Sequence, residues 1–153
     1  MLKFDEQKQL DSVNGALALR GRIEEIVDAI CAEGYKNICW LGIGGTWASA
    51  LQAEVHMKEK SAIELFSENA AEYVTTGNKR VGKGTIVILS SVTGSTIEMV
   101  EGVKKAQADG AKVFGFIDKA EAELAKMVDY VISYPANEVL HGCRPFHEEC
   151  RRV

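Results

Sequence analysis

The stretch that decides the fold is Thr85–Thr96, TIVILSSVTGST, in the middle of the chain. Its first five residues are β-branched or aliphatic, as in a strand that is buried on both faces of a sheet. A hydroxyl-rich turn with one glycine follows, and apolar residues then recur at helical spacing (Ile97, Val100, Val103 and Ala106). The stretch therefore predicts a strand, a loop and a helix in succession.

The same order of elements is predicted earlier in the chain. Asn37–Ile43 is a continuous apolar run, 44–46 forms a glycine-containing turn, and a helix is expected over 47–57. One long helix over Leu10–Glu33 precedes this unit. Further strands are expected over 62–66, 112–117 and 130–133, and further helices over 67–73, 96–109 and 121–127. Alternating strands and helices predict an α/β fold, a three-layer αβα sandwich around a five-stranded parallel sheet of flavodoxin-like order 2-1-3-4-5.

Composition narrows the classes of protein that the chain fits. The 153 residues suit one domain, and 46% hydrophobic with 26% charged residues is ordinary for a soluble chain. A net charge of -4 predicts no nucleic-acid partner, and the absence of a long apolar stretch predicts no membrane partner. With no secretory leader visible, we expect a cytoplasmic protein in which Cys31 and Cys39 are buried thiols.

The loops after the first and third strands are where a ligand is expected. In the 2-1-3-4-5 order these two loops border the crevice at the topological switch point. The loop over 90–96 carries five hydroxyl side chains, and it leads into a helix N-terminus, which favours an anion. Helix capping is the alternative reading, but one cap needs only one hydroxyl. The loop therefore predicts an anion site.

Other ligands fit the sequence less well. Gly42 and Gly44 match the first two glycines of a dinucleotide fingerprint, but Trp47 occupies the third position, where glycine or alanine is needed. Glu68 stands where a ribose-binding acid would lie. NAD(P) is therefore a weaker alternative, and no P-loop motif for a nucleoside triphosphate is present.

The two loops carry a resemblance to a known family. Gly44-Gly45-Thr46 and the string Ser91–Thr96 resemble the two signature loops of the sugar isomerase (SIS) domain, whose second loop usually reads S-x-S-G-x-T. Within the family the chain is most similar to the fructosamine 6-phosphate deglycases, and next to the isomerase half of glucosamine-6-phosphate synthase. The resemblance implies a helical segment over 1–35, a phosphosugar-binding SIS core over 36–136 and an irregular tail over 137–153.

The resemblance also implies a set of site residues. Hydroxyls and backbone N–H groups of the two loops would hold the phosphate of a sugar or amino sugar 6-phosphate. Two acids would lie at the rim of the site, although the second is more easily explained as a partner of the helix dipole. We expect no cofactor and no metal. We expect the chain to form a homodimer. The phosphate-binding residues are Gly45, Thr46, Ser90, Ser91, Val92, Thr93, Gly94, Ser95 and Thr96, and the rim residues are Glu68 and Glu98.

Catalytic residues are not identified by the sequence. Family enzymes carry two SIS halves, with the catalytic glutamate in the later one, and no residue here matches it. His56 lies too far along its helix, and Glu68 is equally explained as a helix-start acid. The predicted function is the N-terminal half of a sugar-phosphate isomerase or a fructosamine 6-phosphate deglycase. A non-catalytic module that senses a sugar phosphate is the alternative.

The C-terminal tail breaks the pattern of the preceding sequence. From Glu138 onward it has neither helical nor strand periodicity. Its two histidines and two cysteines form an H-x-C-x3-H-x2-C string, but so close a spacing with a proline inside disfavours a zinc site. Back-translation into a neighbouring frame yields a helix-like string, so we hypothesise a frameshifted or truncated tail. The four residues of the string are His141, Cys143, His147 and Cys150.

Overall fold

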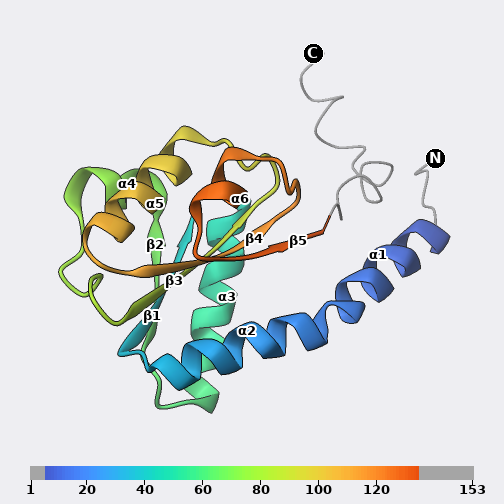
Figure 1. The fold of residues 1–153 in the computed structure, drawn as a ribbon, viewed down its shortest axis with the longest axis horizontal. Coiled ribbons are helices and arrows are strands. Elements are labelled where there is room, and N and C mark those ends of the chain that lie inside the picture. The colour runs from blue at the N-terminus through green and yellow to red at the C-terminus, as the bar shows by residue number, and fades with distance from the viewer. Residues whose placement is uncertain (1–5, 135–153) are drawn as a thin grey trace.

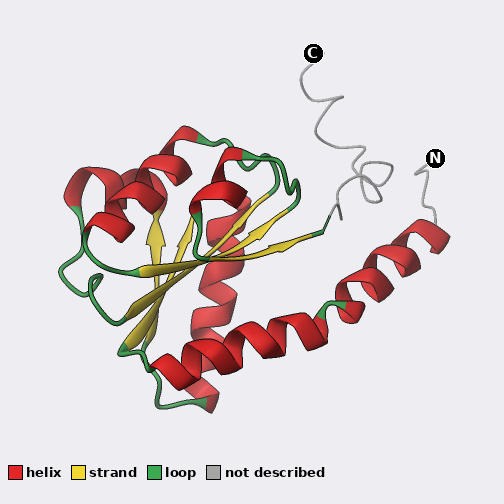
Figure 2. Cartoon of the chain, in the orientation of Figure 1, coloured by secondary structure: helices red, strands yellow, loops and turns green. Residues whose placement is uncertain are grey.

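The computed structural model describes residues 6–134, and all structural statements below concern this part of the chain. This part of the chain forms one sheet of five strands and six helices (Figures 1 and 2). The strands are β1 (Asn37–Gly42), β2 (Leu65–Asn69), β3 (Thr85–Ser91), β4 (Lys112–Ile117) and β5 (Tyr130–Ser133). The helices are α1 (Glu6–Ala18), α2 (Arg20–Glu33), α3 (Gly45–Lys60), α4 (Ala70–Thr76), α5 (Ile97–Ala108) and α6 (Glu123–Met127).

The sheet has the predicted topology. Its strand order is β2-β1-β3-β4-β5, and every neighbouring pair is parallel. In register, Cys39 lies opposite Val87, which lies opposite Val113 on the next strand. The chain reverses its direction of travel across the sheet between β1 and β3, so the topological switch point lies at the carboxyl ends of these two strands. The predicted fold class is confirmed.

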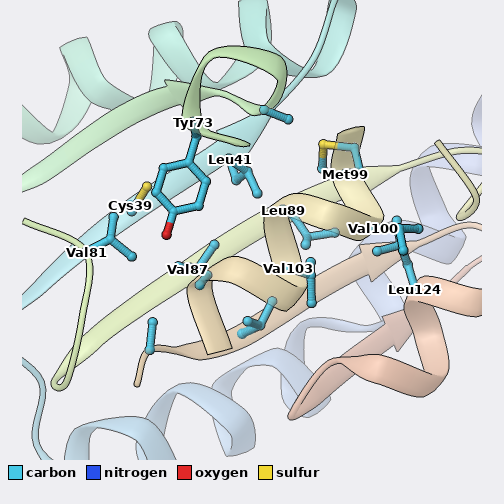
Figure 3. Packing of buried hydrophobic residues seen from close by; sticks show 14 of the residues in the cluster. Cys39, Leu41, Tyr73, Val81, Val87, Leu89, Met99, Val100, Val103 and Leu124 are labelled. Atoms are coloured by element: carbon cyan, nitrogen blue, oxygen red, sulfur yellow. The ribbon is translucent and has the colours of Figure 1, made fainter. Parts of the chain in front are cut away.

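The larger core fills the space between the sheet and helices α4, α5 and α6 (Figure 3). Met99 and Val103 of α5 are buried against Leu41 and Leu89 of the central strands. Tyr73 of α4 is also buried, and its hydroxyl donates to Asp109 at 3.1 Å. Burial and this carboxylate raise the pKa of Tyr73, because both disfavour the phenolate. This face of the sheet is tightly closed.

The opposite face of the sheet is covered less completely. Ile26 and Ile30 of α2 pack on Ile86, Phe114 and Ile132 in a smaller cluster. An apolar cavity of about 230 Å³ remains on this face, with α2 residues on one wall and side chains of β1, β3 and β4 on the other. The cavity residues from the strands are Ile38, Trp40, Ile86, Ile88, Phe114 and Phe116.

Helix α3 lies on this second face and protects the edge of the sheet formed by β2. Strand β2 is one of the two edge strands, and its Ser67 lies opposite Trp40 of β1. Glu54 of α3 accepts hydrogen bonds from the Ser67 backbone N–H at 2.9 Å and from its hydroxyl at 2.7 Å. Lys58 and Ser67 hold the pKa of Glu54 below its usual value, because their hydrogen bonds favour the charged carboxylate. The backbone N–H of Ser67 on this edge strand therefore has a hydrogen-bond partner within the chain.

Several local predictions are corrected by the structure. The single long helix over 10–33 is wrong, because the chain bends at Leu19 and forms two helices (Figure 1). The second strand begins at Leu65 rather than at residue 62, and the next helix is capped by Asn69, whose side chain accepts from Ala71 N at 3.1 Å, rather than by Ser67. Apolar character alone does not fix such boundaries, since the edge strand has one neighbour only.

The expectation for the two cysteines is half right. Cys39 on β1 is buried, and burial raises the pKa of its thiol to about 12, so the thiol stays protonated and unreactive. Cys31 is exposed, contrary to the prediction. It lies on α2 at the apolar cavity between this helix and the sheet, where the incomplete cover leaves its side chain open to solvent.

Candidate functional site

The first loop of the candidate site joins β1 to α3. Gly44 adopts a positive φ of 57° and is the N-cap of the helix, so the chain turns sharply here. The Thr46 hydroxyl closes the turn, because it donates to Ile43 O at 2.9 Å and accepts from Ile43 N at 3.1 Å. A Cβ on Gly42 would lie 2.7 Å from backbone atoms of Trp47. A tryptophan is compatible with this position because its backbone, not its side chain, makes the close approach.

The second loop joins β3 to α5 and is held from inside the protein. Ser91 is buried, and its hydroxyl accepts from Gly94 N at 3.0 Å. Gly94 has a φ of 64°, and its carbonyl accepts from Leu124 N of α6 at 3.0 Å. A Cβ at Gly94 would lie 2.3 Å from Ala122 Cβ, so only glycine fits. The loop is therefore clamped between its own serine and the β4–α6 segment.

The hydroxyl group at the N-cap position of α5 does not cap the helix. Thr96 is the N-cap residue, yet its side chain makes no capping hydrogen bond within the described chain. Its hydroxyl instead lies 3.2 Å from that of Thr93, and the two share one hydrogen bond. Only one of the two hydroxyl hydrogens takes part in this hydrogen bond, so the other hydroxyl can donate its hydrogen elsewhere. The capping alternative does not explain the loop.

A cavity of about 410 Å³ lies beside the two loops at the carboxyl edge of the sheet. Thr46 comes from the first loop, and Ser90, Ser91 and Val92 come from the second. Asp118, which directly follows β4, also lines the cavity, and its backbone N donates to Ser91 O at 3.1 Å. The remaining wall consists of Ala16, Leu19, Ile23, Phe116, Ile117, Ile132 and Tyr134.

The N-terminal helices contribute one wall of this cavity. Tyr134, which follows β5, lies against Gly15 of α1, and its hydroxyl donates to the carbonyls of Asp11 and Ser12 at 3.3 and 3.1 Å. The bend between α1 and α2, at Leu19, faces the same cavity. The helical segment is thus part of the site. No local pattern indicated this wall, because the contact joins residues more than a hundred positions apart.

Part of the predicted set lies outside the cavity. Gly45 is the exposed first residue of α3. Thr93, Gly94, Ser95 and Thr96 form the end of the second loop that leads into α5, where Gly94 is buried. Ser95 is exposed, with its backbone N 3.5 Å from the Thr93 hydroxyl. Residues 93–96 precede the first turn of α5, and neither they nor Gly45 line the cavity.

The two expected rim acids are placed differently from each other. Glu68 of β2 accepts a hydrogen bond from Asn78, a residue of the loop before β3. Glu98 is exposed in the first turn of α5. Neither lines the cavity, and His56 on α3 is exposed and also lies outside it. The carboxylate that does line the cavity is Asp118, which sequence reasoning missed, although it is the first polar residue after a buried strand.

No group of three or more His, Cys, Asp or Glu side chains among residues 6–134 is arranged to hold a metal ion. The histidine and cysteine string over 141–150 and the proposed frameshift lie outside the described residues. Within the same part of the chain, no helix combines the length and the apolar character needed to cross a membrane.

The fold is a doubly wound α/β domain, and a cavity lies at its topological switch point. A family model described as SIS domain matches residues 34–143, more than half of the chain, so the chain belongs to the SIS domain family. The resemblance that the two loops indicated is confirmed at the level of the family.

Curated relatives and solved structures agree with this assignment. Over 115 residues the chain is 27% identical to a glutamine--fructose-6-phosphate aminotransferase [isomerizing] of Caldanaerobacter subterraneus, a match that covers 73% of this chain and 19% of the relative. A protein of Escherichia coli CFT073 has the same fold, with a TM-score of 0.63, 18% identity, and coverage of 85% of this chain and 74% of that one. Glucosamine-6-phosphate deaminase from Thermotoga maritima has the same fold, with a TM-score of 0.61 and 19% identity. That match covers 84% of this chain and 40% of the deaminase. The chain thus spans about a fifth of the length of the aminotransferase.

Proposed function

We propose that this chain binds a phosphorylated sugar at the carboxyl ends of β1 and β3, with the phosphate at the β3–α5 loop. One observation carries the proposal: a cavity lined by the hydroxyl residues Thr46, Ser90 and Ser91 opens beside the N-terminus of α5. A cavity of about 410 Å³ falls in the size range of small-molecule sites. The names of the relatives, which refer to fructose 6-phosphate and glucosamine 6-phosphate, support the same substrate class.

The hydroxyl groups of the loop suit an anion without a positive side chain. Ser91 Oγ accepts from Gly94 N, so its own hydrogen stays available for a ligand oxygen. The Thr93 and Thr96 pair likewise has one hydrogen to donate. The positive end of the α5 dipole adds to these donors. Hydrogen bonds to a charged partner contribute roughly 1.5–3 kcal/mol each, so several give micromolar affinity.

The finer assignments rest on the family resemblance. We propose that the chain is the N-terminal half of a sugar-phosphate isomerase or fructosamine 6-phosphate deglycase, divided into the helical segment over 1–35, the core over 36–136 and the tail over 137–153. DNA sequencing across codons 138–153 and onward tests the tail. A downstream reading frame that encodes a second SIS half supports the proposal, and an in-frame stop without one contradicts it.

Assembly as a homodimer is part of the same proposal. Leu10, Val13 and Leu17 of α1 are exposed large apolar side chains, and α1 extends away from the sheet (Figure 1). Covering these side chains in a second copy removes apolar surface from water. Light scattering coupled to size exclusion gives the mass in solution, and a monomer at micromolar concentration contradicts the dimer. The cytoplasmic location expected from the sequence stays a prediction, which cell fractionation checks.

A thermal-shift titration tests the binding proposal. Glucose, fructose and glucosamine 6-phosphates, a fructosamine 6-phosphate, inorganic phosphate and NAD are added to the wild type and to Ser91→Ala/Thr93→Ala. A ligand at 100 times its Kd adds roughly 2.7 kcal/mol to the free energy of unfolding. We expect sugar phosphates to stabilise the wild type and not the double variant. Stabilisation by NAD alone, or by none of the ligands, contradicts the proposal.

A matched control removes two hydroxyls elsewhere. Thr75 and Thr76 on α4 are exposed, and their hydroxyls donate to backbone carbonyls of the same helix. Thr75→Ala/Thr76→Ala therefore leaves the cavity untouched, and its response to each ligand is expected to equal that of the wild type. An equal loss of response in this variant means that the loss in Ser91→Ala/Thr93→Ala does not report on the site.

Binding without turnover is the second candidate function. Among the described residues that line the cavity there is no histidine or lysine, and Asp118 is the one charged side chain. Ring opening and proton transfer between C1 and C2 require an acid and a base positioned at these atoms. An assay of the interconversion of glucose and fructose 6-phosphates by the isolated chain separates the two functions. Measurable turnover excludes the non-catalytic module.

A further inference from the structure

We propose that the Ser90 hydroxyl binds the sugar part of the ligand and not its phosphate, so that Ser90 lets the cavity distinguish a phosphosugar from phosphate alone. This role, which rests on the proposed function, follows from two features of the site. One is the side of the sheet to which Ser90 belongs, and the other is the set of hydrogen bonds that the hydroxyl groups of the cavity make.

Ser90 and Ser91 belong to opposite faces of the sheet. Side chains alternate along β3, so Ser90 is on the face of Ile88, which packs against the smaller cluster formed with α2. Ser91 is on the face of Leu89, which is buried in the larger core with α5. Ser91 is buried and its hydroxyl accepts from Gly94 N, whereas Ser90 is half-buried. Two adjacent serines thus line the same cavity from different sides.

The Ser90 hydroxyl also differs from the other hydroxyls of the cavity in its hydrogen bonds. The hydroxyls of Thr46, Ser91 and Tyr134 line the same cavity, and each is hydrogen-bonded to backbone atoms of the chain. The Ser90 side chain makes no hydrogen bond within residues 6–134. Its hydroxyl can therefore donate one hydrogen bond to a ligand and accept others, without giving up an existing one.

Most residues on the α2 side of the cavity are apolar. Leu19 and Ile23 line it from the N-terminal helices, and Phe116 and Ile132 line it from β4 and β5. A polar group in apolar surroundings loses free energy of hydration unless a hydrogen bond compensates for the loss. When a ligand displaces water from the cavity, a ligand group that reaches Ser90 supplies this hydrogen bond, and a ligand too short to reach it does not.

The two serines therefore contact different parts of the ligand. The phosphate lies at the β3–α5 loop, where Ser91 Oγ and the N-terminus of α5 favour an anion. The rest of the ligand extends toward the α2 side of the cavity, which Ser90 lines. A phosphate dianion only accepts hydrogen bonds, whereas a sugar hydroxyl both donates and accepts them, as the serine hydroxyl does. Ser90 thus matches the hydroxyl groups of a sugar, and the apolar residues around it pack against the sugar's C–H groups.

Isothermal titration tests this role with inorganic phosphate and the four sugar phosphates of the thermal-shift titration, on the wild type, Ser90→Ala and Ser91→Ala. The affinity for inorganic phosphate is obtained from its competition with a bound sugar phosphate. We expect Ser90→Ala to bind the sugar phosphate about fivefold more weakly than the wild type, because one neutral hydrogen bond is lost, and inorganic phosphate equally well. Ser91→Ala is expected to weaken both kinds of ligand by a similar factor, since both contain the phosphate.

Ser61→Ala is the matched control. Ser61 is half-buried like Ser90, and its hydroxyl accepts from Ile63 N at 3.1 Å in the loop before β2, toward the amino ends of the strands and away from the cavity. Loss of this hydroxyl is expected to leave every affinity at its wild-type value. Ser90→Cys is the second variant if Ser90→Ala does not fold, because it keeps the shape of the side chain and replaces the hydroxyl with a weakly hydrogen-bonding thiol.

The outcomes separate the role of Ser90 from the proposed function. Weaker binding of the sugar phosphate with unchanged binding of inorganic phosphate, in the Ser90 variants and not in Ser61→Ala, supports the role. If the Ser90 variants bind every ligand as the wild type does, or lose affinity for both kinds of ligand by the same factor, the role is wrong while the phosphosugar site stands. An equal loss in Ser61→Ala also contradicts the role. If none of the sugar phosphates binds the wild type, both proposals are overturned.

Discussion

The two strand–loop–helix units at the switch point are alike in sequence and differ in how firmly they are held. Each has a glycine with positive φ after a buried strand, Gly44 in the first unit and Gly94 in the second. Helix α5 buries a whole face in the larger core, whereas Ala50 is the one buried residue of α3. The second loop is therefore attached to the rigid part of the molecule, and the first to its edge.

The difference matters for binding. Donors that must converge on one phosphate need fixed positions, and packing of α5 with the clamp on Gly94 supplies them in the second loop. In the first loop the Thr46 hydroxyl bonds within its own turn and holds only that turn. We infer that the β3–α5 loop is the preformed part of the site. The β1–α3 loop contributes to the shape of the cavity and not to the binding of the phosphate.

The strongest test of this contrast replaces each glycine with alanine. Gly94→Ala combines an unfavourable backbone conformation with a Cβ that overlaps Ala122, so we expect it to lower the free energy of unfolding by roughly 3 kcal/mol or more. Gly44→Ala meets no atom within 4 Å and is expected to cost about 1 kcal/mol for its backbone conformation alone. Urea denaturation measures both values. Equal costs would show that the two loops are held alike.

A smaller effect is expected from truncating one side chain in each helix. Met99 of α5 is fully buried, so Met99→Ala leaves a cavity and is expected to cost about 3 kcal/mol. Leu51 of α3 is 42% exposed, and Leu51→Ala is expected to cost about 1 kcal/mol or less. Thermal unfolding of the two variants at equal protein concentration compares them. A cost for Leu51→Ala that matches that of Met99→Ala would contradict the loose attachment of α3.

The smallest expected effect concerns the link between α3 and the edge strand. The pKa of Glu54 is lowered in the folded protein, so its contribution is present above the ordinary carboxyl value of about 4.3 and is lost as the pH falls through the lowered pKa. Glu54→Gln is expected to cost about 1 kcal/mol at neutral pH and progressively less in acid. Urea denaturation from neutral to acidic pH checks this. A difference from the wild type that does not depend on pH would show that the charge of Glu54 is not what holds Ser67.

Prediction from sequence succeeded where a local pattern carries the information. The apolar run over 85–89 and the helical spacing after it were enough for β3 and α5, because a strand buried on both faces and an amphipathic helix each leave a period in the sequence. Prediction failed at Leu19, where the long helix bends, and at β2, whose edge position weakens the apolar signal. The candidate loops were found, but the wall that α1 and α2 contribute was not.

The sequence by itself determined the class of fold and the two loops, since each follows from residues that are close together in the chain, and the right-handed crossover rule limited the strand order to a few. Only the tertiary structure decided which residues share the cavity. It brought Asp118 and Tyr134 beside Ser90, turned Glu68 toward Asn78, and left Cys31 exposed. Periodicity records which side of an element is buried, but the partner that covers it is chosen by packing between distant segments.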